Sequence, residues 1–177
     1  MVETRPAVGV AVGGRVTDIV VLGVAGGSGD AQAGARVLGL IQDRVPAGVR
    51  LVSSATLDRQ YSELDGATHV LVIDAVDVGR APGAVVLFDG DMLSPCIAQV
   101  TFRDLEIVHH LVLAGQHADA PEEIALLGVQ SVMMDGADLS EPVRASLPDL
   151  AEQALGVVCA WLDRAAPPPD RADPAGC

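Results

Sequence analysis

Residues 68–77 read THVLVIDAVD, and this stretch decides the fold class. Its first part, Thr68–Ile73, is short and rich in β-branched residues, which is typical of a strand buried on both faces in the middle of a parallel sheet. Asp74 follows directly, at the carboxyl end of the expected strand. Open α/β sheets bind their ligands beyond the carboxyl ends of the strands, so a functional site is expected at this end.

The rest of the chain alternates between expected strands and expected helices. Further strands are expected over Asp18–Val24, Val49–Val52, Ala84–Phe88 and Glu123–Val129. Helices are expected over Ala31–Arg44, Ala55–Leu64, Phe102–Ala114 and Ser140–Leu162, with Pro148 marking a kink or boundary in the last. This order predicts an α/β three-layer sandwich, in which a mostly parallel sheet of about five strands carries helices on both faces.

The length of 177 residues fits one domain that buries a substantial core. We expect an N-terminal extension over residues 1–17, as an added edge strand or a loose arm, and one domain over residues 18–163. Residues 164–177 read RAAPPPDRADPAGC, a composition that predicts a disordered, Pro-rich tail.

Composition narrows the classes of partner. The net charge of −13 argues against nucleic acid or an anionic membrane surface as the partner. All 11 basic residues are arginine, which excludes a phosphate-binding loop lysine and a lysine Schiff base. No apolar run is long enough to span a bilayer, and the N-terminus lacks the pattern of a signal peptide. The sequence therefore predicts a cytoplasmic protein that does not enter a membrane.

A glycine-rich turn follows the first expected strand of the domain. Residues 22–34 read LGVAGGSGDAQAG, and Asp30 is the only carboxylate among them. The spacing of Gly23, Gly26 and Gly29 is similar to a dinucleotide-binding fingerprint, but the next strand, VRLVSS, ends in serines instead of the acid that such sites require. Two interpretations stay open: a nucleotide site, or a tight turn that lets helix and sheet pack closely.

Few other residues carry chemistry. A carboxylate at the position of Asp74 is desolvated by its apolar neighbours unless it binds a cation or hydrogen-bond donors, which favours a functional role. His109 and His110 are adjacent in an expected helix and face different ways, so they do not form a shared metal site. Cys96 is the one candidate nucleophile in a loop-like setting, and the alternative is a small buried apolar residue.

Three blocks of sequence together resemble one family. They are VVLGVAGGSGDAQAGARV at residues 20–37, VLVIDAVDVGRAPGAVVLFDGD at residues 70–91, and IALLGVQSVMMDGADLSEPVRASLPDLAEQAL at residues 124–155. Their order and content resemble the nickel–iron hydrogenase maturation endopeptidases over residues 18–160.

The resemblance implies an aspartic-type endopeptidase, a hydrolase that removes the C-terminal peptide of the nickel-loaded hydrogenase large-subunit precursor. Nickel would then be part of the substrate, read by an acid in the glycine turn, an aspartate after the central strand and a histidine before the next helix. Asp74 matches the central aspartate. The acid of the turn aligns with Ala31, beside Asp30, and the histidine aligns with Ala98.

The resemblance therefore implies metal contacts by Asp74 and Asp30 and leaves the catalytic residues unassigned. Because the chain departs from the pattern at Ala31 and Ala98, a second hypothesis stands beside the first. In it, the same scaffold is a non-catalytic assembly protein, or adaptor, that binds a hydrogenase subunit or a maturation factor.

Overall fold

The computed structural model describes residues 10–12, 15–54, 64–89, 120–133 and 136–166 of the chain. The helix expected over Phe102–Ala114 and most of the helix expected over Ala55–Leu64 lie outside the described residues. The same holds for Cys96, Ala98, His109 and His110.

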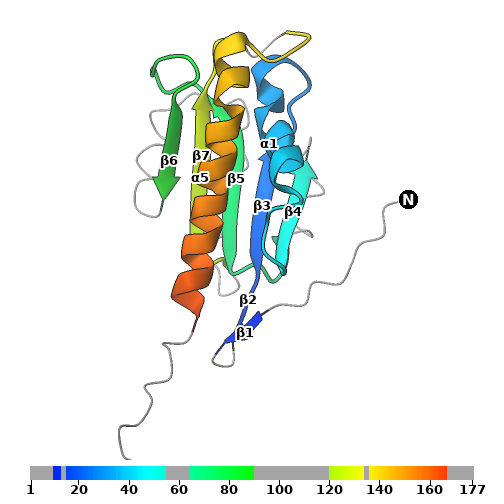
Figure 1. Ribbon diagram of the computed structural model, residues 1–177, viewed down its shortest axis with the longest axis vertical. Coiled ribbons are helices and arrows are strands. Elements are labelled where there is room, and N and C mark those ends of the chain that lie inside the picture. The colour runs from blue at the N-terminus through cyan, green and yellow to red at the C-terminus, as the bar shows by residue number, and fades with distance from the viewer. Residues whose placement is uncertain (1–9, 13–14, 55–63, 90–119, 134–135, 167–177) are drawn as a thin grey trace, which may run out of the picture.

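A five-stranded sheet forms the centre of the molecule, with strand order β4-β3-β5-β7-β6 (Figure 1). The strands are β3 (Ile19–Val24), β4 (Val49–Ser54), β5 (His69–Val76), β6 (Val85–Asp89) and β7 (Glu123–Gln130). Neighbours among β3, β4, β5 and β7 pair in parallel, and every residue of β5 is buried. The predicted α/β class with a mostly parallel sheet is confirmed, and the central strand begins at His69, one residue later than expected, and continues past Ile73 to Val76.

The edge strand β6 runs antiparallel to its neighbour β7, with Leu87 opposite Leu127. Only residues 77–84 separate the end of β5 from the start of β6. A parallel crossover needs a connection of about a dozen residues or more, so a link this short makes the chain reverse direction.

In the described part of the chain, helices α1 (Ala33–Ile41) and α5 (Glu141–Ala165) cover one face of the sheet, as Figure 1 shows. Side chains alternate along a strand, so Leu71 and Ile73 of β5 pack with these helices, whereas Val70 and Val72 belong to a second apolar cluster on the other face. Both faces of the central strand are therefore apolar, as its unbroken sequence predicts.

Glycines let α1 lie directly on the sheet. A Cβ atom added to Gly34 would stand 2.3 Å from the carbonyl oxygen of Ile73 and 2.6 Å from the backbone nitrogen of Val24. A Cβ atom added to Gly23 would stand 2.6 Å from the carbonyl oxygen of Gly34. This close approach supports the interpretation of the glycine turn as a packing feature.

Helix boundaries differ from the expected ones in two places. The segment expected to begin the first helix forms a 3-10 turn, η1 (Gly29–Gln32), before α1 starts. Helix α5 has Ser140 as its N-cap, as expected, but it passes through Pro148 without a boundary and extends to Ala165. The boundary expected at Pro148 is therefore wrong, and the first two residues of the expected tail are helical. Buried residues on both sides of Pro148, including Val143, Leu150 and Val158, pack α5 on the sheet and offset the missing hydrogen bond.

Residues 1–17 include a short antiparallel pair of strands, β1 (Val10–Val12) and β2 (Arg15–Thr17). This pair forms a sheet of its own, so the expectation of an added edge strand on the main sheet is wrong for these residues. In the described part of the chain, no helix is both long enough and apolar enough to cross a membrane.

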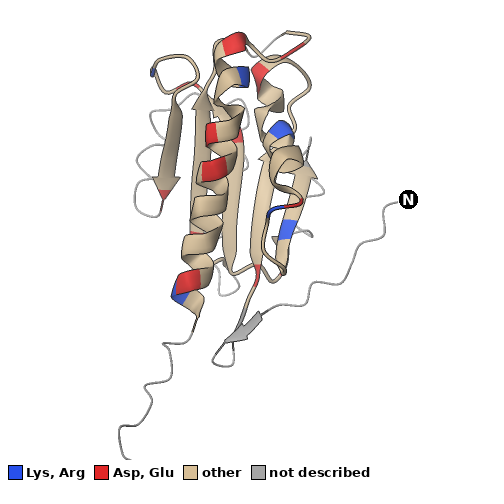
Figure 2. Ribbon diagram, in the orientation of Figure 1, with Lys and Arg blue, Asp and Glu red and all other residues tan. Residues whose placement is uncertain are grey.

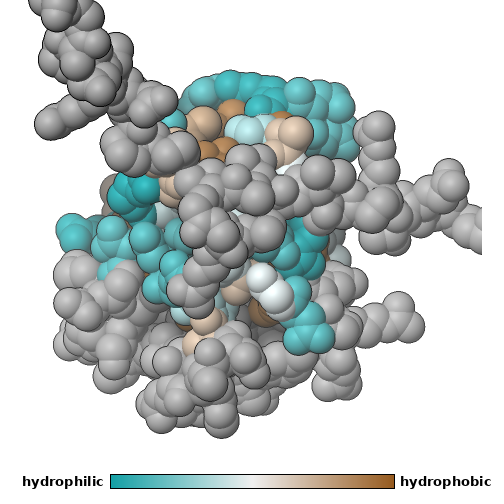
Figure 3. All heavy atoms as spheres, turned by 90° about the horizontal axis from the view of Figure 1, so that it is seen from below, coloured by the Kyte–Doolittle hydropathy of each residue, from teal (hydrophilic) through white to brown (hydrophobic). Residues whose placement is uncertain are grey.

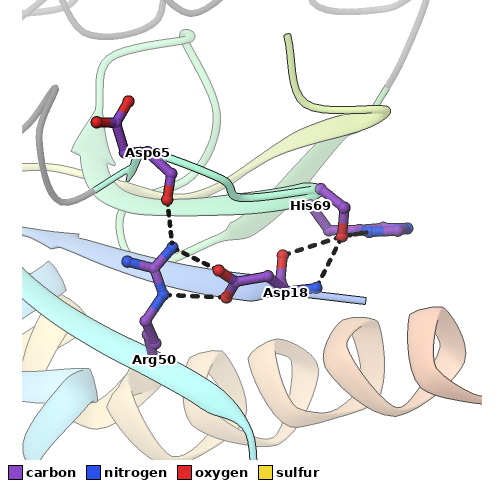
Figure 4. Close-up of polar contacts among 5 residues, drawn as sticks. Asp18, Arg50, Asp65 and His69 are labelled. Atoms are coloured by element: carbon purple, nitrogen blue, oxygen red, sulfur yellow. Dashed lines mark hydrogen bonds and ion pairs between the residues drawn. The ribbon is translucent and has the colours of Figure 1, made fainter. Parts of the chain in front are cut away.

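Charged residues lie mainly on the helices and loops, and the strands carry few of them (Figure 2). At the amino-terminal edge of the sheet, seen from below in Figure 3, hydrophilic residues lie beside smaller apolar patches. There the Arg50 guanidinium donates to both carboxylate oxygens of Asp18, at 3.0 and 2.9 Å, and to the carbonyl oxygen of Asp65 (Figure 4). The Thr68 hydroxyl donates to the carbonyl oxygen of Asp18 and lies 2.9 Å from Nδ1 of His69. This network ties β3, β4 and β5 together at the end opposite the expected site.

Candidate functional site at the carboxyl edge of the sheet

Three loops meet where β3, β5 and β7 end, at the top of Figure 1. They are the glycine turn at residues 25–32, the loop at residues 77–84 and the loop at residues 131–140. Each follows a buried parallel strand, so the fold places the predicted site residues at one edge of the molecule.

Asp74 lies on β5, opposite Gly128 of β7 and close to the end of the strand. Its side chain alternates onto the face of Val72 and Val76, away from α1 and α5. The residue is 8% exposed, and one carboxylate oxygen accepts a hydrogen bond of 2.7 Å from the backbone nitrogen of Ala75. A nearly buried carboxylate at the mouth of a central strand is the arrangement that the sequence predicts.

Asp30 is completely buried, and its carboxylate accepts hydrogen bonds from the loop at residues 131–140. Backbone nitrogens donate from Val132 at 2.9 Å, from Met133 at 3.0 Å and from Ser140 at 2.7 Å. The Ser140 hydroxyl donates at 2.9 Å. We call this arrangement the Asp30 clamp, because one side chain holds the loop after β7 and the first residue of the α5 cap.

Backbone hydrogen bonds reinforce the Asp30 clamp. The nitrogen of Gly29 donates to the carbonyl oxygen of Gly136 at 2.6 Å, and the nitrogen of Asp30 donates to that of Met133 at 3.0 Å. Gly29 has a φ of 57°, in the left-handed region that glycine adopts without strain. The glycine turn is thus fastened to the loop at residues 131–140 through both backbone and side chain.

The electrostatics of Asp30 follow from these contacts. Burial raises the pKa of the Asp30 carboxyl, but the hydrogen bonds from Met133, Val132 and Ser140 together outweigh burial and lower the pKa below its ordinary value of 3.8. The carboxylate is therefore ionised at neutral pH. In this conformation it has no exposed surface with which to touch a metal on another molecule.

Gln130, the last residue of β7, organises the loop at residues 77–84. Its Oε1 accepts from the backbone nitrogens of Val78 and Arg80 at 2.9 and 3.0 Å, and its Nε2 donates to a carboxylate oxygen of Asp77 at 3.1 Å. Gln130 lies in one of the three sequence blocks that resemble the family, but the sequence alone predicts no role for it. A glutamine that ends a buried strand is the signal that points to it, because a buried amide needs partners.

The two residues for which the resemblance implies metal contacts differ in their surroundings. Among the described residues, the Asp30 carboxylate accepts hydrogen bonds from Val132, Met133 and Ser140, whereas Asp74 lies on the sheet face away from α1 and α5. Within the described ranges, no three His, Cys, Asp or Glu side chains are grouped so that they could hold a metal ion. The metal contacts of Asp74 and Asp30 stay predictions.

Comparison with known proteins places the chain in one class, the maturation proteases of hydrogenases. The family model described as hydrogenase maturation protease (HycI) matches residues 49–157, more than half of the chain. The chain belongs to this family. No curated protein sequence matches it.

Solved structures of maturation proteases share the fold. The hydrogenase maturating endopeptidase HybD from E. coli matches with a TM-score of 0.71 at 19% identity, covering 82% of this chain and 94% of that one. The maturation protease HybD from Thermococcus kodakarensis matches with a TM-score of 0.65 at 20% identity, covering 80% and 99%. HycI from Thermococcus kodakarensis KOD1 matches with a TM-score of 0.59 at 21% identity, covering 81% and 93%.

Proposed function

We propose that this chain removes the C-terminal peptide of a nickel–iron hydrogenase large-subunit precursor after nickel has been inserted. The observation that carries the proposal is the family match over residues 49–157. This range includes β5 with Asp74, and Gln130 with the loop at residues 77–84 that it holds. The cytoplasmic location and the aspartic type of the protease belong to the same proposal.

Asp74 is the residue that we propose contacts the substrate's nickel. Its position near the carboxyl end of the buried central strand supports this role, because the surrounding sheet fixes the carboxylate in place before a substrate arrives. Carboxylates are suitable ligands for a divalent ion of intermediate softness. Contact with the metal would let the protein distinguish a nickel-loaded precursor from an unloaded one.

Asp30 contributes to the proposed site mainly by positioning. Its clamp holds the glycine turn against the loop at residues 131–140, and both segments border the edge at which Asp74 lies. A direct contact between Asp30 and nickel would require the donors of the clamp to release the carboxylate. Losing those charge-assisted hydrogen bonds would cost several kcal/mol, about 1.5–3 kcal/mol for each bond.

The experiment is to incubate the purified chain with nickel-loaded and with nickel-free precursor and to follow loss of the C-terminal peptide by mass spectrometry. The proposal predicts peptide release from the nickel-loaded precursor alone. Stable co-purification without release would contradict it in favour of the adaptor hypothesis. Equal release from both precursors would contradict the proposal that the protein distinguishes nickel-loaded from nickel-free precursor.

A further inference from the structure

A hollow of about 480 Å³ lies between α1 and the start of α5. It is lined by Arg36 of α1, by Asp138 and Leu139 of the loop before α5, and by Arg144 and Leu147 of α5. The maturation-protease function proposed above assigns no role to it.

The two arginines of the hollow lack carboxylate partners among the described residues. Arg36 donates to the side chain of Gln32 at 3.3 Å, and Arg144 donates to the carbonyl oxygen of Leu139 at 2.8 Å. Three other arginines pair with acids, Arg44 with Glu152, Arg50 with Asp18 and Arg164 with Glu123, whereas Arg80 pairs with no acid among the described residues. In a chain with a net charge of −13, acidic partners are abundant, so two guanidinium groups without them at one hollow indicate an anion from outside.

The remaining lining residues define the kind of anion. Leu139 is 8% exposed and Leu147 is partly buried, so the hollow presents an apolar surface beside its charges. Two arginines and Asp138 give the lining a net charge of +1, from two positive charges and one negative. This balance fits a single carboxylate with an aliphatic neighbour better than a doubly charged phosphate. The planar guanidinium matches a carboxylate with paired hydrogen bonds.

The hollow and the Asp30 clamp involve neighbouring residues of the chain. Leu139 precedes Ser140, whose nitrogen and hydroxyl are both held by Asp30. On the other side, Arg36 lies in the helical turn that begins at Ala33, where Gly34 packs against the carbonyl of Ile73, the residue before Asp74. The hollow is therefore built on segments whose positions depend on the Asp30 clamp and on the packing of α1 against the sheet.

We propose that the Arg36–Arg144 hollow binds a peptide carboxylate that has an aliphatic side chain beside it. The carboxylate comes either from a free C-terminus or from an acidic side chain. The identification of that peptide as the tail of the hydrogenase precursor rests on the proposed function, but carboxylate binding itself does not.

The test uses three short probes and the full chain, followed by NMR of backbone and arginine side-chain nitrogens. The probes are acetyl-Gly-Ala-Leu with a free carboxyl terminus, the same peptide as its C-terminal amide, and acetyl-Glu-Leu-amide. We expect residues of the hollow to shift with at least one acidic probe, and the neutral amide to bind at least about tenfold more weakly. The acidic probe that binds identifies the source of the carboxylate.

Variants locate the binding. Arg36→Gln with Arg144→Gln should weaken binding of the acidic probe by about tenfold or more. Arg44→Gln with Arg164→Gln removes the same two positive charges outside the hollow and should leave binding within about twofold. A thermal melt confirms that each variant is folded, and an Arg→Lys pair replaces the double variant of the hollow if it is not. Equal binding of acid and amide, no shift with either acidic probe, or unchanged binding by the double variant of the hollow would overturn the proposal. None of these outcomes depends on cleavage of a precursor.

Discussion

Asp30 and Ser140 are joined by two hydrogen bonds, from the backbone nitrogen at 2.7 Å and from the hydroxyl at 2.9 Å. Ser140 is the N-cap residue of α5, yet its side chain makes no bond to the helix backbone and donates to Asp30 instead. One buried carboxylate thereby sets where the last helix begins and how the glycine turn is held.

Asp30→Asn should lower the free energy of unfolding by about 3 kcal/mol, because the amide loses the charge and turns an N–H₂ group toward donors. Denaturant unfolding measures the loss. Asp138→Asn is the matched control, since Asp138 is exposed nearby and should change stability by less than about 0.5 kcal/mol. Equal stability of the two variants would show that the Asp30 clamp does not contribute to the free energy of unfolding.

The loss of stability in Asp30→Asn should also depend on pH. The folded pKa of Asp30 is lowered, so its stabilising contribution is present above the ordinary value of 3.8 and is lost as pH falls through the lowered folded value. The difference in stability between the wild type and Asp30→Asn should therefore narrow in acid. A difference that stays constant down to the acid transition would mean that the carboxylate charge is not what the variant removes.

Gly34→Ala should lower the free energy of unfolding by about 3 kcal/mol, because the new methyl group meets backbone atoms of Ile73 and Val24 that cannot move aside cheaply. Gly39→Ala, five residues further along the same helix, is the control. A Cβ atom added there meets nothing within 4 Å, so alanine should stabilise the helix by about 0.5–1 kcal/mol. Thermal melts of both variants should shift in opposite directions. A shift of both in the same direction would contradict the close packing of α1 on the sheet.

Gln130→Met should loosen the loop at residues 77–84, because the backbone nitrogens of Val78 and Arg80 lose their shared acceptor. We expect a destabilisation of about 1–2 kcal/mol and faster amide exchange in that loop. Gln153→Met changes an exposed glutamine on α5 in the same way and should leave the exchange of the loop unaltered. Unchanged exchange in both variants would remove Gln130 from the account of the site.

His69 provides a pH test at the opposite edge of the sheet. Burial lowers the pKa of His69 against the raising effect of Glu123 and Glu122, and its ring lies 5.2 Å from that of Trp161. The unfolded chain then takes up a proton more readily than the folded one, so stability should decrease as pH falls through the ordinary pKa of 6.5. The slope of stability against pH between pH 8 and 5.5 should flatten in His69→Gln. An unchanged slope would assign that dependence to other groups.

The sheet was predictable because its signal is local and redundant. Thr68–Ile73 is short and rich in β-branched residues, and all of it but Thr68 lies in β5, the buried central strand. The reversal at β6 has a local cause, the short link at residues 77–84, which the alternation of strands and helices does not reveal. Passage of α5 through Pro148 depends on contacts across the fold, namely the packing of α5 on the sheet. A pattern read along the chain does not contain those contacts.

The location of the site was predictable from the sequence, but the hydrogen-bond partners of its residues were not. Asp74 stands at the predicted carboxyl edge because strand and residue are adjacent in sequence. The partners of Asp30 are more than 100 residues away, and those of Gln130 are about 50 residues away, so neither role has a local signature. Asp30 and Gln130 are both buried polar residues. Because buried polar groups need hydrogen-bond partners, a polar residue at an expected buried position indicates such a role.

Loss of the C-terminal peptide from nickel-loaded precursor, compared by mass spectrometry between the wild type and Asp74→Asn, tests the central claim most directly. The variant keeps the size of the side chain and an acceptor for the Ala75 nitrogen, so the fold should survive. We predict that the wild type releases the peptide and that Asp74→Asn, shown by its melt to be folded, releases it at least about a hundredfold more slowly. Release at an equal rate by the folded variant would contradict a role for Asp74 in reading the metal.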